Sequence, residues 1–213
     1  MDKGCRTGRT YKDFEAFIEK NPDTAVVQMD SVMGSVGGKC LLTIHFVQSS
    51  FMLAFLRDAN TSQSVIDIFN SLDTQLGPKV FNRLFPVILT DNGSEFSNPK
   101  KIEQRDHCIG EYNTHRTHIF YCDAGCPHQK GAIEVNHELI RRVVPKGSNF
   151  DSLTQEDIIR MMNHINSYKR KKLNNRSPYE TFSFHFGEEV LYLLGYDSVP
   201  ADQILLKPAL LKK

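Results

Sequence analysis

The sequence predicts an α/β fold in which helices flank a mixed sheet. Short apolar runs bounded by turn residues indicate strands, and longer segments with apolar residues three and four apart indicate helices. Along the chain these patterns give three strands, a helix, a strand, a long loop, a short strand and then further helices. The 213 residues are 40% hydrophobic and include 14 Phe and 7 Tyr, which suffices for a core and excludes a largely disordered chain.

The N-terminal third contains one helix and three strands. The first helix is predicted at residues 11–19, before the breaker formed by Asn21 and Pro22. Apolar runs then predict strands at residues 25–30, 39–47 and 51–56. Their short connections favour an antiparallel arrangement of these first three strands.

The middle of the chain alternates between strong patterns and a polar stretch. An amphipathic helix is predicted at residues 61–76, with Gly77 and Pro78 as its end. A fourth strand follows at residues 86–90. Residues 97–118 are polar and irregular, and we expect a long surface loop there. Residues 119–122 form the last predicted strand.

The C-terminal third is mainly helical. The patterns predict helices at residues 131–144 and 154–168, the second with a capping region at its start. A final short helix is expected from Ser177 onward. Residues 186–213 contain leucines but little periodicity, which is typical of a tail.

Three carboxylates are candidate metal ligands. Asp30 and Asp91 close apolar strands, where burial of an unpaired carboxylate would be costly. Glu134 lies in the first turn of the helix at residues 131–144, opposite its apolar side. Each acid alone is also compatible with a turn or a solvated face. Together they favour a divalent cation, because clustered carboxylates repel one another. Oxygen ligands suit Mg²⁺, with Mn²⁺ as a substitute, and two such ions could support phosphoryl transfer.

Four segments, in order, resemble motifs of one family. Residues 90–96 (TDNGSEF) are similar to the second aspartate motif of retroviral-integrase-type DDE recombinases, and residues 29–34 (MDSVMG) resemble the first aspartate motif of one bacterial branch, the insertion-sequence-thirty family. Residues 131–147 contain GAIEVN, LIRR and PKG, which resemble the glutamate motif of the insertion-sequence-thirty family of transposases. Residues 174–180 (NNRSPYE) resemble the closing motif of that family.

The resemblance implies a fold and a reaction. The fold would be ribonuclease-H-like, a mixed five-stranded sheet whose first three strands are antiparallel. In the implied reaction, water cleaves DNA at the transposon end, and the freed 3′-hydroxyl then attacks target DNA. Asp30, Asp91 and Glu134 would be the catalytic residues and would hold the metal ions. The implied domains are an N-terminal arm at 1–21, an integrase catalytic core at 22–185 and a C-terminal tail at 186–213.

The sequence departs from the family pattern at two places. Family members usually carry an N-terminal helix-turn-helix region, and about 25 residues before the first strand leave no room for one. We therefore expect a truncated reading frame, a C-terminal piece or an excised catalytic domain. After Glu134 the family pattern is Glu-Asn-x-Asn-Gly, whereas residues 134–138 read EVNHE.

The distribution of charge indicates a nucleic-acid partner. The formal net charge is only +1, but residues 139–176 contain nine Lys or Arg against three Asp or Glu. Such a segment would neutralise DNA phosphates, although a solvated basic surface is the alternative. We expect phosphate contacts from Arg141, Arg142, Lys130 and Lys146. Partners would be double-stranded DNA at transposon ends and targets, and the resemblance suggests a homo-oligomer on DNA.

Other site chemistries have weaker support. Cys122, Cys126 and His128, with Cys108 or His118 upstream, could be read as a zinc site, but their spacing is irregular and free thiols are favoured. The odd number of five cysteines argues against a disulfide framework. The sequence contains neither a phosphate-binding Gly-x4-Gly-Lys-Ser/Thr loop nor a Gly-x-Ser-x-Gly elbow.

The sequence also predicts where the protein is located and leaves two rival functions open. No apolar run is long enough to span a membrane and the start has no secretory core, so we expect a cytoplasmic protein of a bacterium. One rival function is a ribonuclease-H-like nuclease without strand transfer. The other is a degenerate, non-catalytic fragment that binds DNA or a partner transposase.

Overall fold

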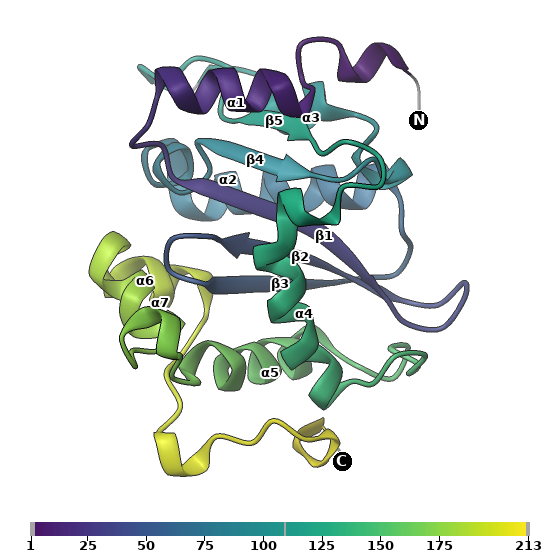
Figure 1. The fold of residues 1–213 in the computed structure, drawn as a ribbon, viewed down its shortest axis with the longest axis vertical. Coiled ribbons are helices and arrows are strands. Elements are labelled where there is room, and N and C mark those ends of the chain that lie inside the picture. The colour runs from purple at the N-terminus through teal and green to yellow at the C-terminus, as the bar shows by residue number, and fades with distance from the viewer. Residues whose placement is uncertain (1–2, 109, 212–213) are drawn as a thin grey trace. The chain divides into compact units, whose positions relative to one another are not determined.

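The computed structural model describes residues 3–108 and 110–211 (Figure 1). Within them the strands form one five-stranded sheet in the order β3-β2-β1-β4-β5. Strand β2 pairs antiparallel with β3, whereas β1 with β4 and β4 with β5 are parallel. The strands are β1 (Val26–Met33), β2 (Cys40–Phe46), β3 (Phe51–Arg57), β4 (Val87–Thr90) and β5 (His118–Tyr121). The predicted mixed sheet is confirmed.

The helices fall into two compact units of the chain. Their bounds are α1 (Tyr11–Lys20), α2 (Ser62–Leu84), α3 (Pro99–Glu103), α4 (Gly131–Val143), α5 (Gln155–Ser167), α6 (Pro178–Phe186) and α7 (Glu188–Leu194). Unit 1 comprises Met1–Asp30 and Asn60–Gly131, and unit 2 comprises Ser31–Ala59 and Ala132–Lys213. The predicted division into arm, core and tail remains a prediction.

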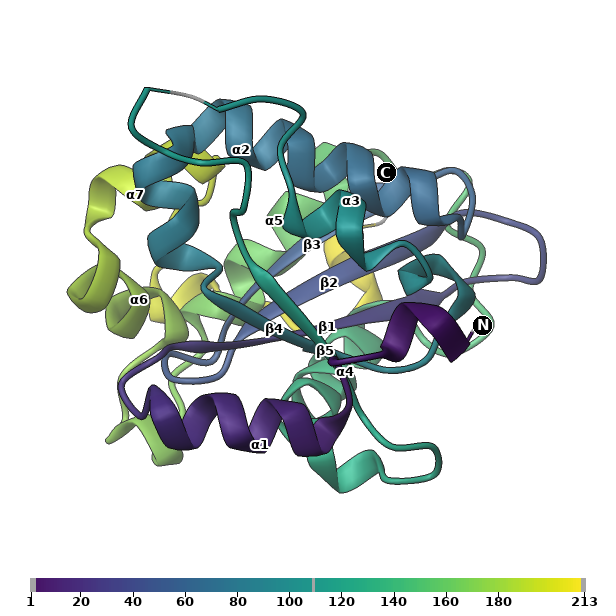
Figure 2. The ribbon, with the colours of Figure 1, turned by 90° about the horizontal axis from the view of Figure 1, so that it is seen from above.

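In unit 1, helices cover both faces of β4 and β5. Figure 2 shows α1 on one side of these strands and α2 with α3 on the other. The first turn of α1 is closed by a capping box, in which Thr10 and Asp13 bond each other's backbone N–H groups. Phe14 of α1 packs with Val87, Leu89 and other buried residues of β4 and β5. The N-terminal segment therefore contributes to the core of unit 1.

Helix α2 consists of two helical segments that meet at Gly77. Gly77 is itself non-helical, with φ +72° and ψ 159°, so the first segment ends there as the sequence predicts, and a second segment continues to Leu84. Pro78 follows the bend, and proline is well accepted in the first turn of a helix. The expected end of the helix is therefore a kink between two segments.

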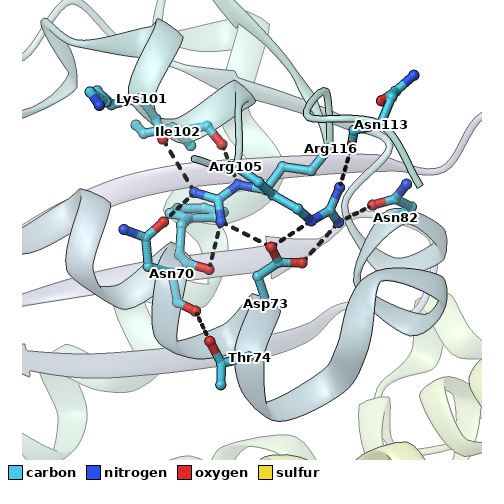
Figure 3. Close-up of polar contacts among 10 residues, drawn as sticks. Asn70, Asp73, Thr74, Asn82, Lys101, Ile102, Arg105, Asn113 and Arg116 are labelled. Carbon is cyan, nitrogen blue, oxygen red and sulfur yellow. Dashed lines mark hydrogen bonds and ion pairs between the residues drawn. The ribbon is translucent and has the colours of Figure 1, made fainter. Parts of the chain in front are cut away.

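The segment predicted as a long surface loop is anchored in unit 1 by buried charges (Figure 3). It contains α3 and two arginines, Arg105 and Arg116, that are 6% and 3% exposed. Arg105 donates to both carboxylate oxygens of Asp73 on α2, over 2.6 and 2.8 Å. Arg116 donates to Asp73 over 3.3 Å. The described residues between α3 and β5 are irregular and mostly exposed, as predicted, but α3 and the burial of Arg105 and Arg116 depart from the expectation of a surface loop, because both arginines have a distant partner in Asp73.

In unit 2, helices pack against β3 and close over its aromatic residues. Figure 1 shows α5 beside β3, and the Asn166 side chain of α5 bonds both backbone groups of Met52. The capping box predicted at Thr154 is present, with Asp157 as its partner. Tyr196, beyond α7, accepts a hydrogen bond from the Ala54 backbone N–H over 3.1 Å. The C-terminal segment therefore has ordered contacts with β3.

No helix in the described parts of the chain has the length and apolar character that a membrane span requires.

Candidate active site

Asp30 and Asp91 are neighbours in unit 1 because β1 and β4 are parallel and in register. Met29 is paired with Thr90, so the next residue along each strand is an aspartate. The carboxyl ends of parallel strands meet at the same edge of a sheet, which is where ligands bind in α/β folds. The sequence predicts a strand end at Asp30, but β1 continues to Met33. Asp30 therefore projects from within a strand, and only β4 ends at this point.

The side chain of Lys130 joins the two carboxylates. Lys130 is the last residue of the short 3₁₀ helix Pro127–Lys130. Its Nζ lies 3.1 Å from Oδ2 of Asp30 and 2.9 Å from Oδ2 of Asp91. Lys130 is only 5% exposed, and lysine is rarely buried so deeply unless it is paired. Burial lowers the pKa of Lys130, but the two aspartates raise it by more, so that pKa lies above its ordinary value.

The turn after β4 fixes the Asp91 carboxylate. The Gly93 backbone N–H donates to Asp91 Oδ1 over 2.9 Å, and the Asn92 side chain donates to the Cys122 carbonyl oxygen over 2.8 Å. A Cβ at position 93 would lie 2.5 Å from Oε2 of the buried Glu95. A side chain at position 93 would therefore force the Glu95 carboxylate to shift.

Cys122 lies beside the carboxylate pair, but its thiol is not activated. Burial, followed by the nearby carboxylates, raises the pKa of its thiol to about 11, although Lys130 lowers it. A protonated thiol is a poor metal ligand and a poor nucleophile. All five cysteines are free, and the described residues contain no group of three or more His, Cys, Asp or Glu side chains arranged to hold a metal ion. These findings favour the free-thiol interpretation over a zinc site.

Glu134 lies on the exposed face of α4 in unit 2, as its helical pattern predicts. Figure 1 shows α4 running across β2 and β3. The opposite face is fixed to β2: Asn136 Nδ2 lies 2.6 Å from His45 Nε2, and His137 Nε2 lies 2.8 Å from Thr43 Oγ1. These two contacts hold the helix that carries Glu134 at a set rotation on unit 2.

The basic residues predicted to contact DNA differ in their surroundings. Arg142 and Lys146 are exposed, at the end of α4 and just after it. Arg141 is half-buried, its Nη2 donates to the Met33 carbonyl oxygen over 3.1 Å, and burial lowers its pKa. Lys130 belongs to unit 1 and is held by Asp30 and Asp91. Arg142 and Lys146 are therefore the members of this set that present their charge to solvent.

Two features of the site were missed by sequence reasoning. One is the contact of Lys130 with both aspartates. The signal in the sequence that could have indicated this contact is a basic residue directly before the helix that carries Glu134. The other is a buried polar chain in which Arg170 donates to Asn136, which in turn contacts His45. No local pattern links these three residues, which are far apart in the sequence.

The carboxylate pair has the chemistry of a divalent-cation site. Oδ2 atoms of Asp30 and Asp91 converge on one positively charged atom, within 3.1 Å of it. Carboxylate oxygens are the ligands that Mg²⁺ prefers. The pair therefore fits a magnesium or manganese ion.

Comparisons with known proteins support the resemblance. No family model matches the chain. A candidate integrase, ORF3 of Spiroplasma virus SpV1-R8A2 B, is 29% identical over 81% of this chain and 50% of its own length. The transposase for insertion sequence element IS4351 of Bacteroides fragilis is 30% identical over 46% of this chain and 28% of its own length. The chain thus spans half or less of the length of these curated relatives.

Solved structures give the class of fold. The catalytic core domain of BIV integrase matches 79% of this chain and 99% of its own length, with a TM-score of 0.50 and 16% identity. A chain of the simian T-cell lymphotropic virus intasome matches 74% of this chain and 54% of its own length, with a TM-score of 0.52 and 12% identity. The fold is that of ribonuclease-H-like integrase catalytic cores. In sequence, the chain is similar to insertion-sequence transposases and viral integrases.

Proposed function

We propose that this chain is the catalytic part of a DDE transposase, which cleaves DNA at insertion-sequence ends and joins those ends to target DNA. The observation that carries the proposal is the convergence of Asp30 and Asp91 on one cation at neighbouring strands of an integrase-type sheet. The names of the relatives, transposase and integrase, support the same function.

Asp30, Asp91 and Glu134 are the proposed catalytic residues, and they would hold two Mg²⁺ ions. When bound, divalent ions polarise a phosphodiester and lower the pKa of an attacking water. The role of the polypeptide is to hold these three carboxylates in position. Asp91 is held by the turn at Gly93, and Glu134 is presented by a helix whose buried face is bonded to β2.

The proposed reaction consists of two phosphoryl transfers. In the first, a water oxygen bonds to phosphorus, the bond from phosphorus to the 3′ oxygen breaks, and a proton from the water passes to that 3′ oxygen, which leaves as the 3′-hydroxyl and leaves a 5′-phosphate on the other strand end. In the second, that 3′-hydroxyl attacks a target phosphodiester and displaces its 3′ oxygen. The number of phosphodiester bonds is conserved in this second step, so no nucleotide cofactor is required.

The DNA partner would be held through its phosphates. Arg142 and Lys146 are exposed and follow Glu134 on the same segment of unit 2, and Arg141 adds a half-buried guanidinium. Cations that neutralise phosphates make binding depend steeply on salt. We propose double-stranded DNA as the substrate and a homo-oligomer as the form that pairs two ends.

Nicking of supercoiled plasmid in Mn²⁺ tests the catalytic proposal. The unmodified chain should convert supercoiled to nicked DNA, and Asp91→Asn and Glu134→Gln should each lower that rate at least about a hundredfold, since each removes a proposed metal ligand. Glu138→Gln is the matched control, because Glu138 is also exposed on α4, four residues after Glu134. Equal nicking by the parent and by Glu134→Gln would refute the role of Glu134.

A joining assay separates the transposase from its rivals. A labelled duplex with a free 3′-hydroxyl should become linked to plasmid by the parent chain but not by Glu134→Gln. Nicking without joining would favour a ribonuclease-H-like nuclease. Binding of DNA without either reaction would favour a non-catalytic fragment.

A further inference from the structure

The ammonium of Lys130 occupies the place between the two aspartates where a metal ion would bind. We propose that Lys130 is a placeholder cation, which balances one of the two negative charges of the Asp30–Asp91 pair in the metal-free chain and must leave when a divalent ion enters. The proposal rests on the proposed function, because it concerns the same carboxylates. It assigns to Lys130 a role in metal binding in addition to the DNA contact expected from the sequence.

Distances make the two cations mutually exclusive. Nζ of Lys130 is within hydrogen-bond distance of Oδ2 in both aspartates, at 3.1 and 2.9 Å. A magnesium ion shared by the same oxygens would lie about 2.0–2.1 Å from each. Both cations would then have to occupy the same small volume between the carboxylates. Their like charges would also repel each other, so one cation must displace the other.

Charge balance favours the exchange. Lys130 supplies one positive charge to two negative carboxylates, so the trio keeps a net negative charge. A divalent ion matches both charges, which an ammonium cannot do.

The position of Lys130 allows its side chain to leave. It ends a single-turn 3₁₀ helix, Pro127–Lys130, and its charge is carried at the end of a long side chain with several rotatable bonds. The two aspartates, by contrast, extend from strands that are paired in register. Metal entry can therefore move a long flexible side chain while the strands stay in place.

Calorimetric titration with Mn²⁺ alone tests the competition directly. Lys130→Gln removes the competing charge and should bind Mn²⁺ about tenfold more tightly than the parent chain, because coupling between competing ligands is reciprocal. Lys130→Arg keeps the charge and should bind no more tightly than the parent. Lys79→Gln, which removes an exposed lysine of α2, should leave the affinity unchanged. Adding Asp91→Asn to Lys130→Gln should abolish the gain.

Amine labelling of the unmodified chain tests the same exchange without a variant. Lys130 is 5% exposed and should react slowly with an acetylating reagent when no metal is present. Saturating Mn²⁺ should raise the labelling of Lys130 several-fold relative to that of Lys79, measured by peptide mass spectrometry. This measurement holds even if Lys130→Gln does not fold.

The possible results distinguish failure of the placeholder proposal for Lys130 from failure of the proposed metal site. Mn²⁺ binding that requires Asp91 but is equal or weaker in Lys130→Gln would overturn the placeholder and leave the proposed function standing. Unchanged labelling of Lys130 in Mn²⁺ would do the same. Absence of any Asp91-dependent Mn²⁺ binding, in the parent and in Lys130→Gln alike, would overturn both.

Discussion

In unit 1, a single buried carboxylate, that of Asp73, pairs with two buried arginines. Its carboxylate is 6% exposed and accepts hydrogen bonds from both Arg105 and Arg116. The two guanidiniums also lie over the Phe81 ring, 5.9 and 5.3 Å from its centroid. Asp73 is therefore the anion that allows two arginines of residues 104–117 to be buried against α2.

Asp73→Asn should destabilise the chain strongly. Removing one partner of a buried ion pair leaves uncompensated charge in the interior and costs about 3–5 kcal/mol. Urea unfolding followed by circular dichroism measures this loss. Asp67→Asn is the matched control, because Asp67 is exposed on the same helix and bonds only to the neighbouring Gln63 side chain, so it should change stability by less than about 1 kcal/mol. Equal losses of stability in the two variants would contradict the role of Asp73 as the partner of the buried arginines.

At the residue scale, the sequence predicts acids better than it predicts their partners. Asp30 and Asp91 stand out because each follows an apolar run, which is a local signal. Asp73 and Lys130 stand out only through contacts with residues tens of positions away. Burial of Arg105 and Arg116 could therefore not be predicted from a polar, irregular stretch of sequence.

At the scale of elements, the capping signal at Thr154 predicted a helix start, and Gly77 with Pro78 marked the end of one helical segment but not the second segment that follows it. Capping boxes also begin the helices after Thr10 and Ser177. Gly77 followed by Pro78 predicts a stop, but the same pair serves as a bend followed by a new first turn. Local chemistry permits both outcomes, and packing of Phe81 and Leu84 into the core decides between them.

The bend in α2 makes Gly77 hard to replace. Its φ of +72° with ψ 159° lies in a region of positive φ that is essentially restricted to glycine, and holding a residue with a Cβ there costs about 1–3 kcal/mol. Gly77→Ala should therefore lower the free energy of unfolding by about this amount, although a Cβ there would meet no neighbouring atom within 4 Å. Ser71→Ala, at an exposed position of the same helix, should be neutral or slightly stabilising in the same denaturation experiment.

At the scale of the whole molecule, the buried His45 couples stability to pH. Burial first, and then the positive charges of Lys172, Arg170 and His137, lower the pKa of His45 to about 3. Its Nε2 faces the Asn136 amide, and its Nδ1 is buried with no hydrogen-bond partner among the described residues. The folded chain therefore keeps His45 neutral at pH values where the unfolded chain would protonate it.

The sign of the pH dependence follows from this difference. Below the unfolded pKa of about 6.5 the unfolded state binds a proton that the folded state refuses, so stability falls as pH decreases toward 3. The contribution of His45 to the slope is about 1.4 kcal/mol per pH unit in that window. His45→Gln keeps an acceptor for Asn136 and should flatten the dependence of the free energy of unfolding on pH between 6 and 4. His107→Gln, at an exposed position, should leave the slope as it is, and an unchanged slope in both variants would count against His45.

The whole fold was predictable in outline because its signals are repeated along the chain. Strand runs, capping residues and four ordered motifs agree with one another, and the sheet and its helices confirm the prediction. The metal-site roles of Asp30, Asp91 and Glu134 stay a prediction. The Arg170–Asn136–His45 chain could not be foreseen, since arginine is rarely buried unless it is paired with an acid, and among the described residues the Arg170 side chain instead donates to Asn136 and to the Ile165 carbonyl oxygen.

The lysine between the two aspartates also bears on how the chain is made. Some small domains fold only when their metal binds, because the metal's binding free energy supplies the free energy of folding, and they unfold again when it is withdrawn. Here a cation of the polypeptide itself, the Lys130 ammonium, already lies 2.9 Å from Oδ2 of Asp91 in the metal-free fold. A newly synthesised chain would thus acquire its fold first and its metal afterwards. A chelator would return it to the lysine-bound form, ready for reloading.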